Sequence, residues 1–106
     1  MTDLDIDQQL LGLPGISLVL FTSVGCSGCR WAHQQLPGWQ LPVDRLCWVD
    51  AGHNGGAVER YQVFHLPALF VVCEGQFFGQ IQTRLTPSDL TDAIHQALTR
   101  TPEDLP

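Results

Sequence analysis

Two of the four cysteines, Cys26 and Cys29, lie three residues apart, whereas Cys47 and Cys73 are isolated in the sequence. A Cys-x-x-Cys pair can cycle between a dithiol and a disulfide, or it can bind a metal ion. A small secreted disulfide scaffold would carry more cysteines and fewer apolar runs. The spacing therefore predicts redox chemistry at Cys26 and Cys29, and it leaves open a metal site in which His33 is a third ligand.

The cysteine pair lies where a predicted strand passes into a predicted helix. Residues 16–21 form a nearly continuous apolar run, which is typical of a buried strand. At a helix N-terminus, unpaired N–H groups and the helix dipole favour a thiolate, so we expect a lowered pKa for Cys26. Cys29 lies one turn further along and can attack a mixed disulfide on Cys26. The helix should end at Pro37, and its inner face should carry Cys29, Ala32, His33 and Leu36.

The rest of the pattern predicts an α/β fold. Thr86 and Pro87 mark the start of a last helix, whose apolar stripe reaches Leu98. The alternation of strands and helices favours a central mixed sheet of about four strands with helices on both faces. The other expected elements are a helix over 2–11, strands over 46–50, 68–73 and 77–82, a weak helix over 57–61 and a turn at Glu74-Gly75.

Length and charge predict a single domain and exclude several classes of protein. A chain of 106 residues suits a single domain, and we expect a helical N-terminal segment over 1–13 and a flexible tail over 99–106. The net charge of −6, with only five basic residues, offers no cationic surface for nucleic acid. No apolar run approaches the ~18 residues of a membrane span. The acidic N-terminus is unlike a secretory signal or a mitochondrial presequence, so we expect a cytoplasmic protein.

The chain carries, in order, the strand at 18–21, the Cys-Ser-Gly-Cys motif, Val49-Asp50, Leu66-Pro67, the Glu74-Gly75 hairpin and the last helix. With these features in this order it resembles the thioredoxin family. The resemblance implies a thioredoxin-like fold, in which a cis peptide bond precedes Pro67 and places it beside the pair. It also implies a thiol–disulfide oxidoreductase without an organic cofactor. Cys26 would attack a substrate disulfide, and Cys29 would resolve the mixed disulfide. The resemblance covers residues 14–98.

The family also implies partners and further site residues. Substrates would be protein or small-thiol disulfides, and electrons would come from an unidentified reductase or a low-molecular-weight thiol. Arg30 adds a positive charge near the pair. His33 can accept a proton from Cys29, and His65 can tune the Cys26 thiolate, although an ordinary structural role is the alternative for both histidines. The residues expected to contact substrate are Gly25, Ser27, Gly28, Trp31, Leu66 and Pro67.

Several positions depart from the family's pattern. Gly25 stands where thioredoxins carry a tryptophan, and Gly28 stands in place of the proline inside the motif. Leu20 and Leu46 replace a buried aspartate and its accompanying lysine. The proton of the Cys29 thiol must therefore pass to water or to another base. Exchange with a thioredoxin reductase is not implied.

Other functions remain open from the sequence. Cys26, Cys29 and His33 can supply three zinc ligands, or the cysteine pairs of two subunits can share an iron–sulfur cluster. The same scaffold can also be a non-enzymatic interaction module. Cys47 and Cys73 fall within predicted strands, where small thiols pack well, and a second, regulatory disulfide between them is the alternative.

Overall fold

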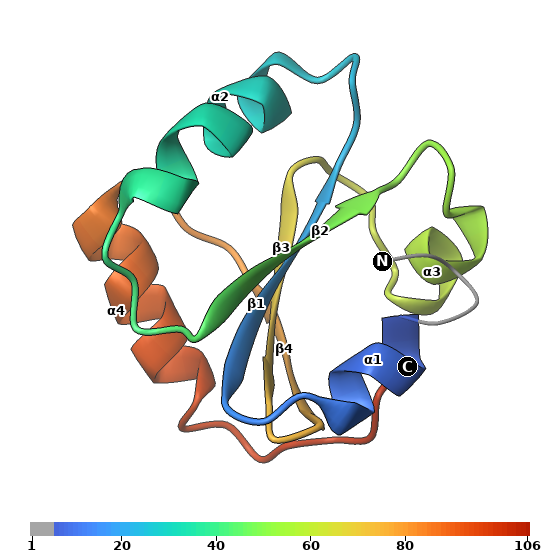
Figure 1. The fold of residues 1–106 in the computed structure, drawn as a ribbon, viewed down its shortest axis with the longest axis vertical. Helices are drawn as coiled ribbons and strands as arrows, with labels where there is room; N and C mark the ends of the chain where they lie inside the picture. The colour runs from blue at the N-terminus through green and yellow to red at the C-terminus, as the bar shows by residue number, and fades with distance from the viewer. Residues whose placement is uncertain (1–5) are drawn as a thin grey trace.

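The computed structural model describes residues 6–106, except for the side chain of Asp7. In that part of the chain, a four-stranded sheet lies between helices on both faces (Figure 1). None of the helices described there is long and apolar enough to cross a membrane. The predicted helix over 2–11 falls partly outside the described residues. The elements are α1 (Ile6–Gly12), β1 (Ile16–Thr22), α2 (Ser27–Gln35), the 3₁₀ helix η1 (Leu36–Gly38), β2 (Arg45–Asp50), α3 (Gly55–Arg60), β3 (Ala68–Cys73), β4 (Gln76–Ile81) and α4 (Pro87–Ala97).

The sheet brings the two segments of the predicted site, the cysteine loop and the residues before β3, to the same end of its strands. The strand order is β2-β1-β3-β4, with β2 parallel to β1, β3 antiparallel to β1, and β4 antiparallel to β3. The end of β1 therefore meets the start of β3, where Phe21 pairs with Ala68. The cysteine loop follows β1 and Pro67 immediately precedes β3. The predicted mixed sheet is confirmed, and its topology explains how residues forty positions apart become neighbours.

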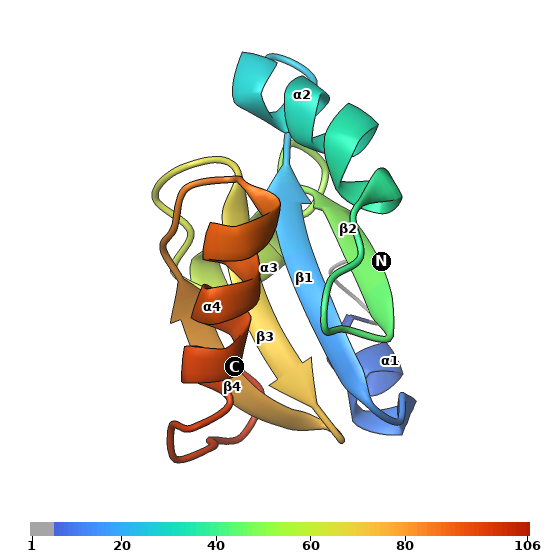
Figure 2. The same cartoon turned by 90° about the vertical axis from the view of Figure 1, so that its left-hand side faces the viewer.

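Side chains of the central strands alternate between two cores. On one face, Val19, Phe21 and Phe70 pack with residues of α1 and α3. On the other face, Leu18 and Leu20 pack with residues of α2 and α4. Figure 1 shows these two helix pairs on opposite sides of the sheet, and Figure 2 views the sheet from the side of α2 and α4. Because both faces of β1 are covered, its sequence is a continuous apolar run rather than an alternating one.

Backbone conformation defines the β3–β4 turn, and a side-chain hydrogen bond defines the start of α4. Glu74 and Gly75 both have positive φ, of 52° and 74°, which is the conformation of a type I′ hairpin turn. The Thr86 side chain accepts a hydrogen bond of 3.2 Å from the backbone N–H of Asp89 and so caps α4. Both features agree with the sequence prediction, and the element bounds that can be compared within residues 6–106 differ from it by at most two residues.

The C-terminal segment differs from the flexible tail that we expected over 99–106. Glu103 pairs with Phe77 on the outer edge of β4 through two backbone hydrogen bonds of 2.8 and 2.9 Å. The Arg100 guanidinium donates to the carbonyl oxygens of Phe78 and Gln80 on the same edge. An uncovered edge strand exposes unpaired backbone groups that invite association with other chains. The segment is therefore packed on β4 because it satisfies these backbone groups.

Candidate active site

Cys26 and Cys29 form a disulfide at the start of α2, and their Cα atoms lie 5.2 Å apart. Cys26 is the N-cap residue of α2, and its Sγ accepts a hydrogen bond of 3.1 Å from the backbone N–H of Cys29. The two cysteines differ in exposure, because Cys26 is half-buried and Cys29 is 0% exposed. An incoming group can therefore reach Cys26 and is shielded from Cys29.

The segment before β3 forms the other side of this site. The peptide bond between Leu66 and Pro67 is cis, as the resemblance implies. The carbonyl oxygen of Leu66 lies 3.7 Å from Cys26 Sγ. A Cβ atom added at Gly28 would lie 3.8 Å from Cδ of Pro67. The structure therefore brings together Cys26, Gly28, Leu66 and Pro67, which the sequence analysis had named.

A groove continues from Pro67 along the same end of the sheet. It has a volume of about 380 Å³, and its walls include His65 and Pro67 on one side and Thr83 and Leu85 of the β4–α4 loop on the other. Sequence reasoning named the first two residues and missed the loop residues. The Glu74-Gly75 hairpin is a sequence signal for these loop residues. A hairpin makes β4 antiparallel to β3, so the loop after β4 lies at the end of the sheet where β3 begins.

The other predicted substrate contacts lie on the exposed surface around the disulfide. Gly25 and Ser27 are exposed beside the cysteines. Arg30 is also exposed, and its guanidinium donates a hydrogen bond of 2.8 Å to the carbonyl oxygen of Val24. Trp31 is 43% exposed and packs edge-on against Trp39. Their part in substrate binding stays a prediction.

His33 takes a different position from the one its helical spacing suggests. Its ring stacks on Trp48 with centroids 3.8 Å apart, and its Nε2 lies 3.1 Å from Thr22 Oγ1. Unlike Cys29 on the same helix, it is exposed. Among residues 6–106, no group of three or more His, Cys, Asp or Glu side chains is arranged to hold a metal ion. The geometry therefore gives no support to a zinc site with His33 as the third ligand.

The positions that distinguish this site from thioredoxins are apolar. Leu20 is 0% exposed and lies in the core between the sheet, α2 and α4. Leu46 packs against the same core. The inner face of α2 behind Cys29 is therefore lined by hydrocarbon, and a thiol proton released there has to reach solvent.

Cys47 and Cys73 face opposite sides of the sheet. Cys47 lies beside Val19 in the core under α1 and α3. Val72 points into that same core, so the next residue, Cys73, points to the other face. A disulfide between these two thiols within one chain is therefore incompatible with the fold, which corrects the alternative that the sequence left open.

Burial raises the pKa of the Cys47 thiol above its ordinary value of 9.0, although Ser17 and Arg45 partly offset this effect. The folded protein therefore keeps this thiol protonated at a pH where the unfolded chain releases the proton. We expect the free energy of unfolding to decline as pH rises above about 9, by at most about 1.4 kcal/mol per pH unit. Denaturant titrations of the reduced protein between pH 8 and 10 measure this slope.

The matched variant for this prediction is Cys47→Ala, which removes the thiol without adding a charge. Its unfolding free energy should depend less steeply on pH above 9 than that of the wild-type chain. Equal slopes in the two proteins would show that Cys47 ionises as easily in the folded state as in the unfolded one.

Similar solved structures agree with this architecture. The zinc-bound form of human ERp44 matches 91% of this chain with a TM-score of 0.70 and 18% identity, over 30% of its own chain. A thioredoxin from Trichomonas vaginalis matches 67% of this chain with a TM-score of 0.57 and 28% identity, over 66% of its own chain. The chain matches no protein-family model and no curated protein in sequence.

The fold is therefore thioredoxin-like. With a Cys-x-x-Cys disulfide at the start of α2, it is a thioredoxin fold of the redox type. The chain spans less than a third of the length of ERp44 and about two thirds of that of the Trichomonas thioredoxin.

Proposed function

We propose that this protein is a thiol–disulfide oxidoreductase that uses Cys26 as the attacking thiol and Cys29 as the resolving thiol. The observation that supports this most strongly is the unequal exposure of the two sulfur-bearing residues. Cys26 is half-buried beside the Leu66 carbonyl, whereas Cys29 is fully buried one helical turn deeper. An exchange enzyme needs this difference in exposure. Its attacking thiol must be accessible to the substrate, whereas its resolving thiol reacts only with the mixed disulfide.

The reaction begins with the reduced protein. The Cys26 thiolate attacks one sulfur of the substrate disulfide, so that a Cys26–substrate disulfide forms and the other substrate sulfur leaves as a thiolate. The Cys29 thiolate then attacks the Cys26 sulfur, which forms the Cys26–Cys29 disulfide and releases the second substrate thiolate. Two electrons have passed to the substrate, and both released thiolates take up protons from solvent. A reductase or a low-molecular-weight thiol restores the dithiol.

The start of α2 favours the thiolate of Cys26. The Cys29 N–H that donates to Cys26 Sγ stabilises negative charge on that sulfur. The positive end of the helix dipole and the nearby Arg30 act in the same direction. We therefore expect the pKa of the Cys26 thiol to lie below its usual range. Cys29 has the opposite environment, since its burial opposes ionisation.

Substrates of this activity are protein or small-molecule disulfides that can enter the groove beside Pro67. The groove bears His65 and the β4–α4 loop, and its end at Pro67 adjoins Gly28 of the cysteine motif. A cytoplasmic location belongs to this proposal.

A redox titration tests the proposed function. The protein is equilibrated in thiol/disulfide buffers of stepped potential, its free thiols are trapped by alkylation, and peptide masses locate the modified cysteines. We expect Cys26 and Cys29 to titrate together as one reversible two-electron couple. A Cys47→Ser/Cys73→Ser variant should show the same midpoint potential. Failure of the pair to form a disulfide reversibly, or a couple that disappears in this variant, would contradict the proposal.

A further inference from the structure

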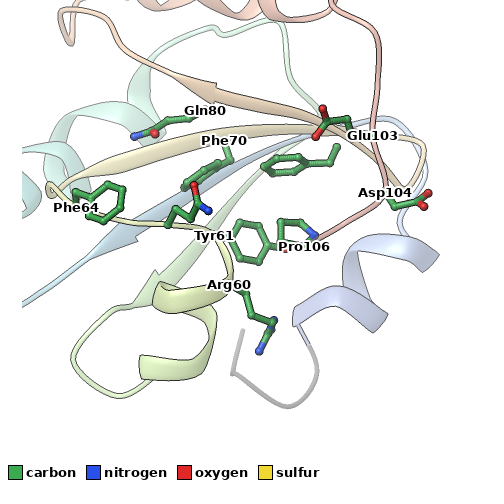
Figure 3. Close-up of a pocket in the computed structure, with 10 residues that line it drawn as sticks. Arg60, Tyr61, Phe64, Phe70, Gln80, Glu103, Asp104 and Pro106 are labelled. Carbon is green, nitrogen blue, oxygen red and sulfur yellow. The ribbon is translucent and has the colours of Figure 1, made fainter.

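A second cavity lies away from the cysteines, on the face of the sheet that carries α3. It is an open cavity with a volume of about 420 Å³, bordered by the end of α3 and the loop after it, β3, β4 and the C-terminal segment (Figure 3). None of the residues from 23–30 or 65–67, which form the redox site, lines it. Its size falls in the range of sites that hold small organic molecules. Nothing in the proposed exchange reaction uses this cavity.

The base of the cavity is aromatic. The rings of Tyr61, Phe70 and Phe77 contact one another with centroids 5.4 to 5.8 Å apart. Phe64 extends this surface and is 81% exposed, although most large apolar side chains of the described residues are buried. A ring with this exposure offers its face to a ligand. The rings of Tyr61 and Phe70 are buried beneath the cavity, so an apolar or aromatic body would contact Phe64 and the half-buried Phe77.

The rim of the cavity is acidic at the C-terminal segment. Glu103 and Asp104 both line it and are exposed, and the backbone of Glu103 is held against Phe77 by two hydrogen bonds. In Figure 3, Phe64 and these two acids lie at opposite ends of the aromatic group. Arg60 also lines the cavity, but in Figure 3 its guanidinium and the Asp104 carboxylate both point away from the aromatic side chains, so Glu103 is the acid on their side. The charge that faces a ligand is therefore negative.

We propose that this cavity binds a small organic cation, in which an aromatic or alkyl body carries an ammonium or guanidinium group. The body packs on Phe64 and Phe77, and the cationic group lies at Glu103 on the acidic rim. The apolar part of the ligand then contacts the aromatic side chains, and its cationic group contacts the acidic rim. Attraction of a cation to an aromatic face adds to that of the carboxylates.

Three probes that share one aromatic body test the charge requirement. They are phenethylammonium, the neutral 2-phenylethanol and the anionic phenylacetate, each titrated into the isotope-labelled full chain and followed by amide NMR shifts. We expect phenethylammonium to shift the amides of Gln62, Phe64 and Glu103, and to bind about tenfold more tightly than phenylacetate at low salt. Shifts confined to other parts of the chain would overturn the proposal, as would equal binding of the three probes.

Paired charge variants separate the local acids from the overall negative charge. Glu103→Gln/Asp104→Asn should bring the cation and the anion to nearly equal affinity, and the backbone pairing of Glu103 should keep the fold. Asp89→Asn/Asp92→Asn changes the net charge equally on α4, which lies on the opposite face of the sheet, and should keep the preference. If both variants lose the preference, or if neither does, the acids at the rim are not the determinant and the assignment of the cavity is wrong.

Discussion

Replacement of Cys26 by serine is expected to abolish disulfide reduction by the purified protein, with a loss of at least about a hundredfold in rate. A serine hydroxyl does not ionise at neutral pH and cannot attack a disulfide. Cys29 cannot take over, because its side chain is 0% exposed behind the first turn of α2. The assay follows reduction of a protein disulfide with dithiothreitol as the electron donor, and the rate without protein is subtracted.

Cys73→Ser is the matched control for this loss. It makes the same chemical change at a half-buried thiol at the other end of β3, far along the strand from the redox loop. Its rate should stay within about twofold of the wild-type rate. A Cys26→Ser variant that keeps most of the activity would show that another thiol performs the chemistry, and the proposed roles would have to be abandoned.

The second large effect concerns stability and follows from the aromatic core. Phe70→Ala is expected to lower the free energy of unfolding by about 3–5 kcal/mol, because it removes a large side chain and leaves a cavity. Phe70 is 2% exposed, and its ring contacts those of Phe21, Tyr61 and Phe77. For a domain of this size, such a loss lowers the melting temperature by more than about 10 °C. Thermal and denaturant unfolding measure both quantities.

Phe64→Ala provides the comparison, because it deletes the same side chain from a site that is 81% exposed. We expect its unfolding free energy to change by less than about 0.5 kcal/mol. Equal losses at the two positions would mean that Phe64 is buried in solution. A small loss at Phe70 would mean that the aromatic contacts do not support the fold.

The junction between β1 and α2 could be predicted from the sequence alone. The apolar run at 16–21 and the change to helical spacing after Cys26 each carry a periodic signal, so the cysteines were correctly placed at the start of a helix. The position of Pro67 beside them came from the family resemblance instead. Only the sheet order makes these residues neighbours, and local periodicity does not encode sheet order.

Other features lacked a signal of this kind. Glu103 pairs with Phe77 through backbone groups, which every residue type possesses, so the polar composition of 99–106 suggested a flexible tail. His33 has the spacing of the inner helix face, but its ring meets Trp48 from β2. The aromatic cavity joins rings from elements that are separated in sequence. Each of these features depends on tertiary contacts between distant segments.

The central claim, that Cys26 attacks and Cys29 resolves, is tested most directly by trapping the mixed disulfide. Reduced Cys29→Ser protein is mixed with a peptide disulfide, quenched with acid, digested, and its cross-linked peptides are identified by mass. We predict that the substrate peptide accumulates on Cys26, because the resolving thiol is missing, and that the reduced wild-type chain accumulates little of this adduct. A substrate bound to Cys47 or Cys73, or a Cys26→Ser variant that traps the peptide on Cys29, would contradict the proposed order of attack.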